Sequence, residues 1–199
     1  TGHRILERYG MTETNMNTSN PYEGERRAGT VGFPLPGVAL RITGEDGSLL
    51  PRGEIGQIEV RGDNVFQGYW RMPDKTAEDL APDGWFRTGD LGMIDPDGYV
   101  VIVGRGKDLI ISGGFNIYPK EVELLIDEMP GVLESAVIGV PHPDFGEGVV
   151  AVIARAEGAE PDPDAIIADL SDRLARFKQP KKVMIIDELP RNTMGKVQK

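Results

Sequence analysis

The chain has 199 residues, of which 39% are hydrophobic, and this is enough for one or two globular domains with a real core. It has no cysteine, which excludes disulfides and cysteine nucleophiles, and its two histidines, His3 and His142, are too few for a histidine-rich metal site. A formal net charge of −10 argues against general nucleic-acid binding. No apolar run reaches the ~20 residues that span a bilayer, and no signal peptide is visible. We therefore expect a cytoplasmic protein without a membrane span.

The first half of the chain predicts β-structure. Short segments of alternating polar and apolar residues occur at Val38–Ile42, Ile55–Arg61 and Tyr99–Val103, which is typical of strands. Turn sequences separate them, such as Pro82-Asp83-Gly84 and Pro96-Asp97-Gly98. We therefore expect a β-rich, barrel-like first part.

The second half alternates strands with helices. Pro119 suits the first position of a helix, which the helical spacing of apolar residues continues to Met129. A second helix is predicted over Pro163–Phe177 because its apolar residues lie on one stripe. Predicted strands complete a small α+β domain, at Val132–Val140, Val149–Ala154 and Val183–Asp187.

Four clusters of residues can carry chemistry, although each has a plainer interpretation. Tyr9–Glu13 combines an aromatic ring, a hydroxyl and a carboxylate, or is only a capping turn. Trp85–Asp90 ends a β-rich stretch with a carboxylate of the kind that binds a ribose, or holds an ordinary turn aspartate. Gly104–Glu121 crowds charged residues and glycines into a bend. Pro190–Lys196 presents a lysine beside a glycine, or belongs to a disordered tail.

The glycine-rich stretch matches neither common phosphate-binding motif. It is not a Walker A loop, since Asp108 follows Gly106-Lys107 where Ser or Thr is required. It is not GxGxxG either, since Leu109 stands where the third glycine should be.

In their order along the chain, the four clusters resemble the signature motifs of the adenylate-forming superfamily, the acyl-CoA synthetases. The resemblance covers essentially the whole chain and implies ATP, Mg²⁺ and CoA as cofactors. It also implies the end of a large AMP-binding domain over residues 1–106 and a small mobile α+β domain over residues 107–199.

The resemblance assigns a role to each candidate residue. Tyr9 would stack on adenine, Thr12 would contact the α-phosphate and Glu13 would ligate Mg²⁺. Asp90 and Arg105 would bind the ribose hydroxyls. Gly10 and Met11 would also hold the nucleotide, and Lys107 would stand at the hinge between the domains. Gly113 and Gly114 would line the CoA tunnel. Lys196 would bridge the carboxylate substrate and the adenylate.

The residues after Glu13 point to the acid. Thr14–Pro21 is a polar run, which suits a short polar acid better than a fatty chain if it borders the acyl pocket. Three stretches, Tyr9–Gly29, Gly104–Glu121 and Pro190–Lys199, resemble bacterial malonyl-CoA synthetases, which also accept methylmalonate. If the run is only a surface loop, a fatty-acid or aryl-acid CoA ligase is equally consistent. An adenylation domain that loads a carrier protein and a non-catalytic AMP- or CoA-binding module are further alternatives.

The chain also departs from the superfamily pattern. It contains no Ser/Thr/Gly-rich phosphate loop and begins with Thr1 rather than Met. We therefore expect a fragment that is inactive alone, truncated at the end of its small domain.

Overall fold

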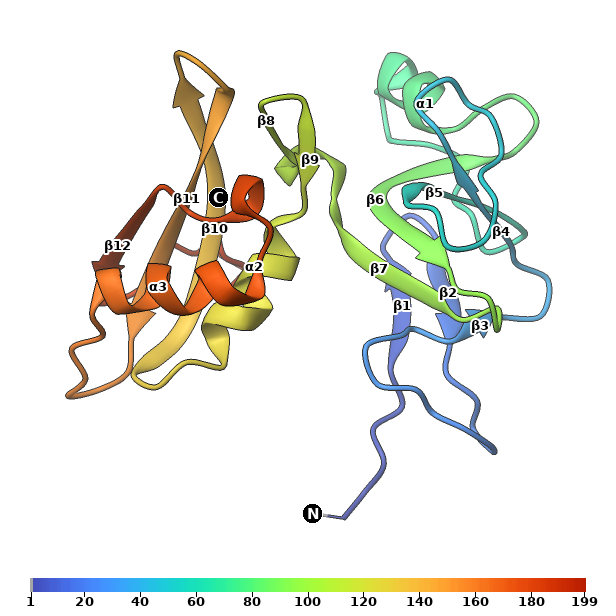
Figure 1. Ribbon diagram of the computed structural model, residues 1–199. Helices are drawn as coiled ribbons and strands as arrows, with labels where there is room; N and C mark the ends of the chain where they lie inside the picture. The colour runs from blue at the N-terminus through green and yellow to red at the C-terminus, as the bar shows by residue number, and fades with distance from the viewer. Residues whose placement is uncertain (1) are drawn as a thin grey trace. The chain divides into compact units, whose positions relative to one another are not determined.

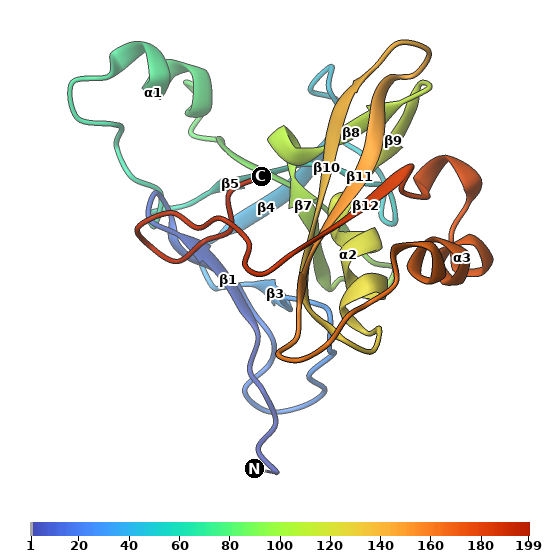
Figure 2. The same ribbon diagram turned by 90° about the vertical axis from the view of Figure 1, so that its left-hand side faces the viewer.

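The computed structural model describes residues 2–199, which form two compact units, Thr1–Gly106 and Lys107–Lys199. In this described part, no helix is both long and apolar enough to cross a membrane. Figures 1 and 2 trace both units.

The first unit is built from two antiparallel sheets. A three-stranded sheet holds β1 (Arg8–Met11), β2 (Asn15–Ser19) and β3 (Phe33–Pro34). A four-stranded sheet follows chain order, with α1 (Pro73–Asp79) inserted before its third strand; its strands are β4 (Ala39–Thr43), β5 (Gly56–Arg61), β6 (Phe86–Ile94) and β7 (Val100–Arg105). The predicted β-rich character is confirmed.

The barrel-like form is a correction to the sequence interpretation. Among the described residues, β4 and β7 occupy opposite edges of the four-stranded sheet and do not pair with each other. A sheet closes into a barrel only when its first and last strands pair. The sheet therefore stays open, and its side chains pack against neighbouring segments instead.

The core of the first unit joins the two sheets. Ile58, Val60 and Phe86 are essentially inaccessible to solvent, and they pack with Ile42. Tyr9, from the first strand, packs against the same cluster. Burial of these side chains thus fixes the first predicted motif against the four-stranded sheet.

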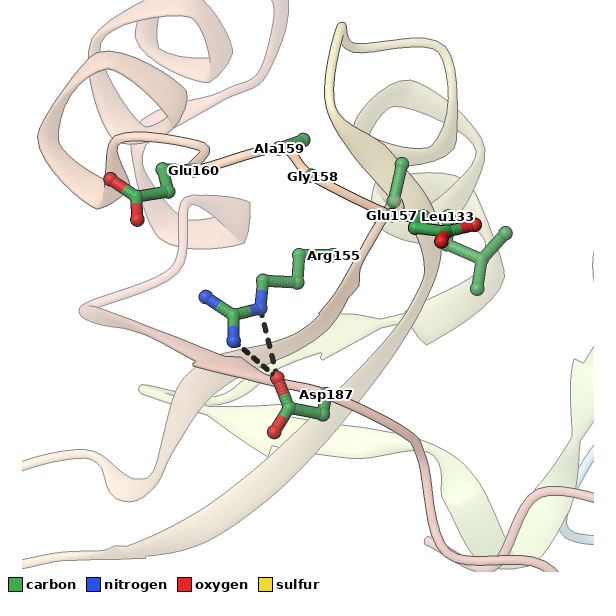
Figure 3. A pocket seen from close by; sticks show the side chains of 8 residues that line it. Leu133, Arg155, Glu157, Gly158, Ala159, Glu160 and Asp187 are labelled. Carbon is green, nitrogen blue, oxygen red and sulfur yellow. Dashed lines mark hydrogen bonds and ion pairs between the residues drawn. The ribbon is translucent and has the colours of Figure 1, made fainter.

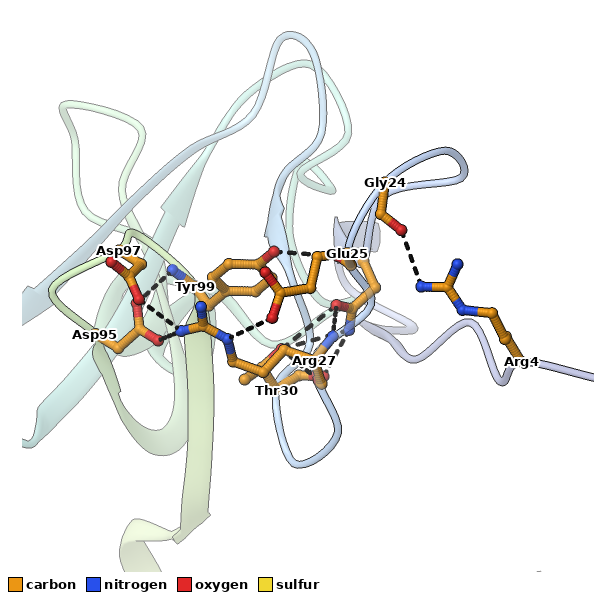
Figure 4. Close-up of polar contacts among 9 residues, drawn as sticks. Arg4, Gly24, Glu25, Arg27, Thr30, Asp95, Asp97 and Tyr99 are labelled. Atoms are coloured by element: carbon orange, nitrogen blue, oxygen red, sulfur yellow. Dashed lines mark hydrogen bonds and ion pairs between the residues drawn. The ribbon is translucent and has the colours of Figure 1, made fainter.

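A partly exposed network of ion pairs holds the long loop after β2. Arg27 reaches two carboxylates in the turn between β6 and β7, Asp95 at 2.7 Å and Asp97 at 2.9 Å (Figure 4). Its guanidinium also lies over the ring of Tyr99, 4.2 Å from the centroid. The Tyr99 hydroxyl donates to the carbonyl of Glu25 at 3.1 Å, so the loop is tied at two points.

The second unit is an α+β domain. Its sheet runs in the order β10 (Val132–His142), β11 (Gly146–Arg155), β8 (Ile110–Ser112), β9 (Phe115–Ile117), and β12 (Lys182–Ile186) pairs in parallel with β11. Two helices, α2 (Pro119–Asp127) and α3 (Pro163–Arg173), cover one face of this sheet (Figure 1). Ile126 of α2 and Leu170 of α3 are fully buried in the same cluster as Ile153 of β11.

One helix is shorter than predicted. The apolar stripe predicted a helix to Phe177, but α3 ends at Arg173 because Leu174 adopts extended backbone angles. The side chain of Gln179 donates to the freed Leu174 carbonyl at 2.9 Å, which replaces a helical partner. Phe177 still packs against the core, from a separate 3₁₀ turn, Arg176–Lys178.

The two faces of α2 give a direct test of this core. We expect Ile126→Ala to lower the free energy of unfolding by about 2–5 kcal/mol, since a fully buried side chain leaves a cavity. Leu124→Ala is the matched control, because Leu124 is 53% exposed on the same helix and its loss should cost about 0.5 kcal/mol or less. Urea unfolding monitored by circular dichroism measures both, and equal losses would contradict the packing described.

Candidate functional site

The first motif forms the tip of a β-hairpin. Met11 pairs with Asn15, and the turn between them places Thr12 in solvent and Glu13 half-buried. The Thr14 N–H donates to the Met11 carbonyl at 3.2 Å and closes the turn. Gly10 is required here because a Cβ would lie 2.1 Å from the Asn15 carbonyl oxygen. Close strand approach, rather than a ligand, explains this glycine.

Tyr9, Asp90 and Arg105 come together in one hydrogen-bonded line. The Tyr9 hydroxyl donates to Asp90 Oδ2 at 2.5 Å, and Arg105 Nε lies 2.9 Å from Asp90 Oδ1. Asp90 and Arg105 are cross-strand partners in the β6–β7 ladder. Asp90 is buried while the Arg105 side chain is 48% exposed, so the line runs from the interior to the surface.

This environment changes the acidity of Tyr9. Burial of the ring and hydroxyl raises the pKa of Tyr9 above its usual range, and the negative charge of Asp90 raises it further. The hydroxyl is therefore a neutral donor at physiological pH. A carboxylate has about four lone-pair positions, so Asp90 keeps room for two further donors such as ribose hydroxyls.

The polar run after Glu13 is not a surface loop. Thr14, Asn17 and Thr18 are fully buried, and Asn20 nearly so. Asn20 donates to the Thr30 carbonyl at 2.8 Å and Thr18 to the Val31 carbonyl at 2.8 Å. The run thus anchors the hairpin from within the unit.

Sequence reasoning missed a loop, residues 64–69, that forms hydrogen bonds to this hairpin. The Phe66 N–H donates to the Glu13 carbonyl at 2.8 Å, and Asn64 Nδ2 donates to the Thr14 carbonyl at 2.7 Å. Tyr69 brings its hydroxyl to Glu13 Oε1 at 3.2 Å. The available signal was Gly68 before Tyr69: its φ is +141°, and a Cβ there would lie 2.7 Å from the Thr76 side chain.

Tyr69 is also a neutral donor. Burial raises the pKa of Tyr69 to about 12, with the charge of Glu13 as the next cause. Its hydroxyl lies 3.3 Å from Asp79 Oδ2 as well, so two carboxylates face one hydroxyl.

Gly113 and Gly114 form the two-residue turn of the β8–β9 hairpin. Ser112 pairs with Phe115, and the two glycines have φ of +58° and +81°. Positive φ at both central positions is the requirement of a type I′ hairpin turn. Gly113 also borders a hollow of about 140 Å³ with the rings of three phenylalanines and a lysine, Phe115, Phe145, Phe177 and Lys181.

Lys196 lies on a well-bonded hairpin, not on a disordered tail. Arg191 pairs with Val197 across it, and the Asn192 side chain accepts from the Lys196 N–H at 3.0 Å. Arg191 also binds Glu134 through both carboxylate oxygens, at 2.6 Å for Oε1, and Lys199 forms an ion pair with the buried Glu123. Lys196 itself is exposed, and among the described residues no ion pair involves it.

The predicted residues therefore fall into two sets. The first unit gathers Tyr9, Asp90 and Arg105 and places Gly10, Met11, Thr12 and Glu13 on the adjoining hairpin. The second unit carries Lys107, Gly113, Gly114 and Lys196. Lys107 is its first residue and lies 78% exposed in a 3₁₀ turn.

The second unit also contains a larger cavity. It has a volume of about 550 Å³ and is lined by the segment after β11 together with Leu133 and Asp187 (Figure 3). Arg155 is the basic residue in this lining and already pairs with Asp187 at 2.6 Å. None of the predicted site residues borders it.

The described residues contain no preformed metal cluster. Within residues 2–199, no group of three or more His, Asp or Glu side chains is placed to hold a metal ion. Mg²⁺ is commonly bound by one or two carboxylates and completed by substrate phosphates, so a lone Glu13 fits that type of site.

Comparison with known proteins defines the class. Residues 1–70 match the family model of the AMP-binding enzymes, and residues 121–196 match the model of the AMP-binding enzyme C-terminal domain. The chain belongs to the AMP-binding enzymes, and its curated relatives include several CoA ligases.

Three individual relatives show the extent of the similarity. The chain is similar over its whole length to ATP-bound MatB from Rhodopseudomonas palustris, with 65% identity, a TM-score of 0.95 and coverage of 40% of that chain. It is 46% identical to the sulfoacetate–CoA ligase of Cupriavidus necator, covering 100% of this chain and 39% of the relative. It is 42% identical to the malonate–CoA ligase of Arabidopsis thaliana, covering 100% of this chain and 34% of the relative. The chain thus spans little more than a third of the length of these curated relatives.

The contact between Tyr9 and Asp90 can be tested by titration. Ionised tyrosine is negative, so a neighbouring carboxylate raises its pKa and loss of that charge should lower it. We expect Asp90→Asn to lower the pKa of Tyr9 while leaving it above the usual value of about 10, since burial is the larger cause. NMR titration of labelled tyrosine rings measures the change. Asp97→Asn is the control, because Asp97 pairs with Arg27, and an unchanged Tyr9 in Asp90→Asn would refute the assigned contact.

Proposed function

We propose that the intact protein is an AMP-forming acid–thiol ligase that adenylates malonate and transfers the acyl group to CoA. The products are malonyl-CoA, AMP and pyrophosphate. The observation that carries this proposal is the joining of Tyr9, Asp90 and Arg105 in one line beside the hairpin that bears Thr12 and Glu13. Membership of the AMP-binding enzymes supports it.

The first unit would bind the nucleotide. Tyr9 offers a ring fixed by its bond to Asp90, against which adenine stacks. Asp90 and Arg105 would receive the two ribose hydroxyls, one as acceptor and one as donor. The exposed Thr12 hydroxyl would donate to the α-phosphate, with the backbone of Gly10 and Met11 alongside the nucleotide.

Glu13 would hold Mg²⁺ together with the phosphates of ATP. Its carboxylate is half-buried at the hairpin tip, and Tyr69 donates to one of its oxygens, which leaves the other oxygen for a cation. The bound ion would neutralise the charge of the departing pyrophosphate.

Lys196 would act in the first half-reaction. Attack of a carboxylate on the α-phosphate brings two anions together, and a lysine supplies a compact positive charge between them. No general base is required because the nucleophile is already ionised. The hairpin holds the Lys196 backbone through Asn192, which limits the entropy lost when its side chain binds the acid.

CoA would bind along the second unit in the second half-reaction. Gly113 and Gly114 would line the path of its pantetheine arm, and Lys107, the first residue of this unit, would serve as the hinge. The thiol attacks the acyl carbonyl of the adenylate, and AMP leaves.

The choice of malonate draws on two further points. The resemblance of three stretches to bacterial malonyl-CoA synthetases agrees with the Arabidopsis relative, a malonate–CoA ligase. Sulfoacetate, named for the Cupriavidus relative, is likewise a short acid with a second anionic group on the carbon next to its carboxylate. A short acid carrying two negative charges is the chemistry that they share.

Removal of the Lys196 charge should separate the two half-reactions. We expect Lys196→Ala in the full-length protein to lower the rate of adenylation by roughly 10²–10³-fold, which corresponds to about 3–4 kcal/mol of barrier. Thioester formation from preformed malonyl-adenylate should remain largely intact. Lys182→Ala, an exposed lysine on β12, is the control. Equal loss of both steps in Lys196→Ala would contradict the role.

The acid can be identified by a substrate panel. Pyrophosphate exchange on the full-length protein with malonate, methylmalonate, acetate and octanoate should be fastest with malonate and next with methylmalonate. A preference for octanoate would remove the malonate assignment but leave the acid–thiol ligase proposal intact. Absence of exchange with every acid would count against the ligase itself.

A further inference from the structure

Tyr69 contacts the residue that the proposed function assigns to the metal. Its hydroxyl lies 3.2 Å from Glu13 Oε1 and 3.3 Å from Asp79 Oδ2. A tyrosine hydroxyl has one hydrogen, and two ionised carboxylates can only accept, so the two compete for a single proton. Both distances exceed the usual 2.7–2.8 Å of an O–H···O bond, as expected for a shared donor.

The two carboxylates differ in how their charge is compensated. Lys75 donates to Asp79 Oδ1 at 3.0 Å and also to Glu78 at 3.1 Å. Among residues 2–199, no ion pair reaches Glu13, so its negative charge is balanced by no basic side chain. A neutral hydroxyl that orients Glu13 leaves this charge available for a cation, which a lysine or arginine would not.

The ring of Tyr69 is held rigidly. It packs edge-on against Phe66 at 4.8 Å, and Phe66 packs edge-on against the buried Phe86 at 5.3 Å. The Tyr69 N–H donates to Thr76 Oγ1 at 2.9 Å. The same loop grips the hairpin backbone through Phe66, whose N–H donates to the Glu13 carbonyl. The hydroxyl and the Glu13 backbone are thus fixed relative to each other.

We propose that Tyr69 is a positioning residue for the metal ligand Glu13. By holding Oε1, its hydroxyl restricts the side chain to orientations that present Oε2 to the cation on the ATP phosphates. Partners that orient a metal ligand in this way typically contribute 10–100-fold to metal affinity. This inference rests on the proposed function, because it takes Glu13 as the metal ligand.

The test measures the coupling between metal and nucleotide without turnover. Isothermal titration calorimetry gives the Kd of the full-length protein for α,β-methylene-ATP in saturating Mg²⁺ and in EDTA. The Kd in EDTA divided by the Kd in Mg²⁺ is the coupling ratio. We expect Tyr69→Phe to reduce this ratio by about 10-fold or more while leaving the Kd in EDTA unchanged. Phenylalanine keeps the ring that packs on Phe66 and removes only the hydroxyl.

Three further variants set the controls. Glu78 lies on α1 beside Asp79 and makes no hydrogen bond to Tyr69. Glu78→Gln removes a charge there and should leave the ratio unchanged. Asp79→Asn removes the competing charge and should leave the ratio at least as large as in the parent protein. Glu13→Gln should abolish the coupling.

The outcomes distinguish the inference from the proposed function. If Glu13→Gln loses the coupling and Tyr69→Phe keeps it, the positioning role is overturned and the metal ligand stands. If Glu13→Gln keeps the coupling, the assignment of Glu13 fails and the inference fails with it. If Tyr69→Phe weakens binding equally in Mg²⁺ and EDTA, its role is structural and the inference is overturned.

Discussion

The candidate nucleotide site of the first unit depends on the buried carboxylate of Asp90. An ionised side chain in the interior is tolerated only when it is paired and hydrogen-bonded, and Asp90 meets this condition through Tyr9 and Arg105. The bond to Tyr9 connects the three-stranded sheet to the four-stranded sheet. The ion pair with Arg105 links the buried carboxylate to a side chain that is half exposed. The contacts that satisfy Asp90 inside the fold therefore also assemble the residues proposed to bind the nucleotide.

Much of the fold could be predicted because its elements follow simple periodic patterns. The strands from Gly56 to Arg61 and from Val132 to His142 and the helix beginning at Pro119 lie close to their predicted bounds. The pattern could not place β1 and β2, since their interior is filled by Thr14, Asn17 and Thr18 instead of apolar residues. Thr18 is buried with its hydroxyl bonded to the Val31 carbonyl, and Asn17 accepts from the side chain of Asn64, and a pattern of hydrophobicity does not predict such bonds. The open edges of the sheets depend on long-range pairing, which is equally invisible in the sequence.

The candidate site was predicted from motifs, and the structure adds the contacts between them. The spacing from Tyr9 to Asp90 is 81 residues, yet one hydrogen bond joins them, and only the fold reveals it. Tyr69 was missed because it is a single tyrosine in a loop, and the preceding Gly68 indicates a bend but no ligand. Its importance comes from Glu13 and Asp79, which are 56 and 10 residues away in the chain. For Gly113 and Gly114, which the motif assigned to a ligand, the geometry of the hairpin turn is sufficient to explain why both residues are glycine.

The distribution of ion pairs separates anchoring residues from those left for a ligand. On the Lys196 hairpin, Arg191 pairs with Glu134 and Lys199 with Glu123, so the flanking basic side chains fix the hairpin. In the first unit, Lys75 compensates Asp79 while Glu13 receives only neutral donors. A lysine that bridges two anions and a carboxylate that holds a cation both need their charge uncompensated before substrate binds. Among residues 2–199, neither Lys196 nor Glu13 belongs to an ion pair, while ion pairs next to each of them stabilise the surrounding structure.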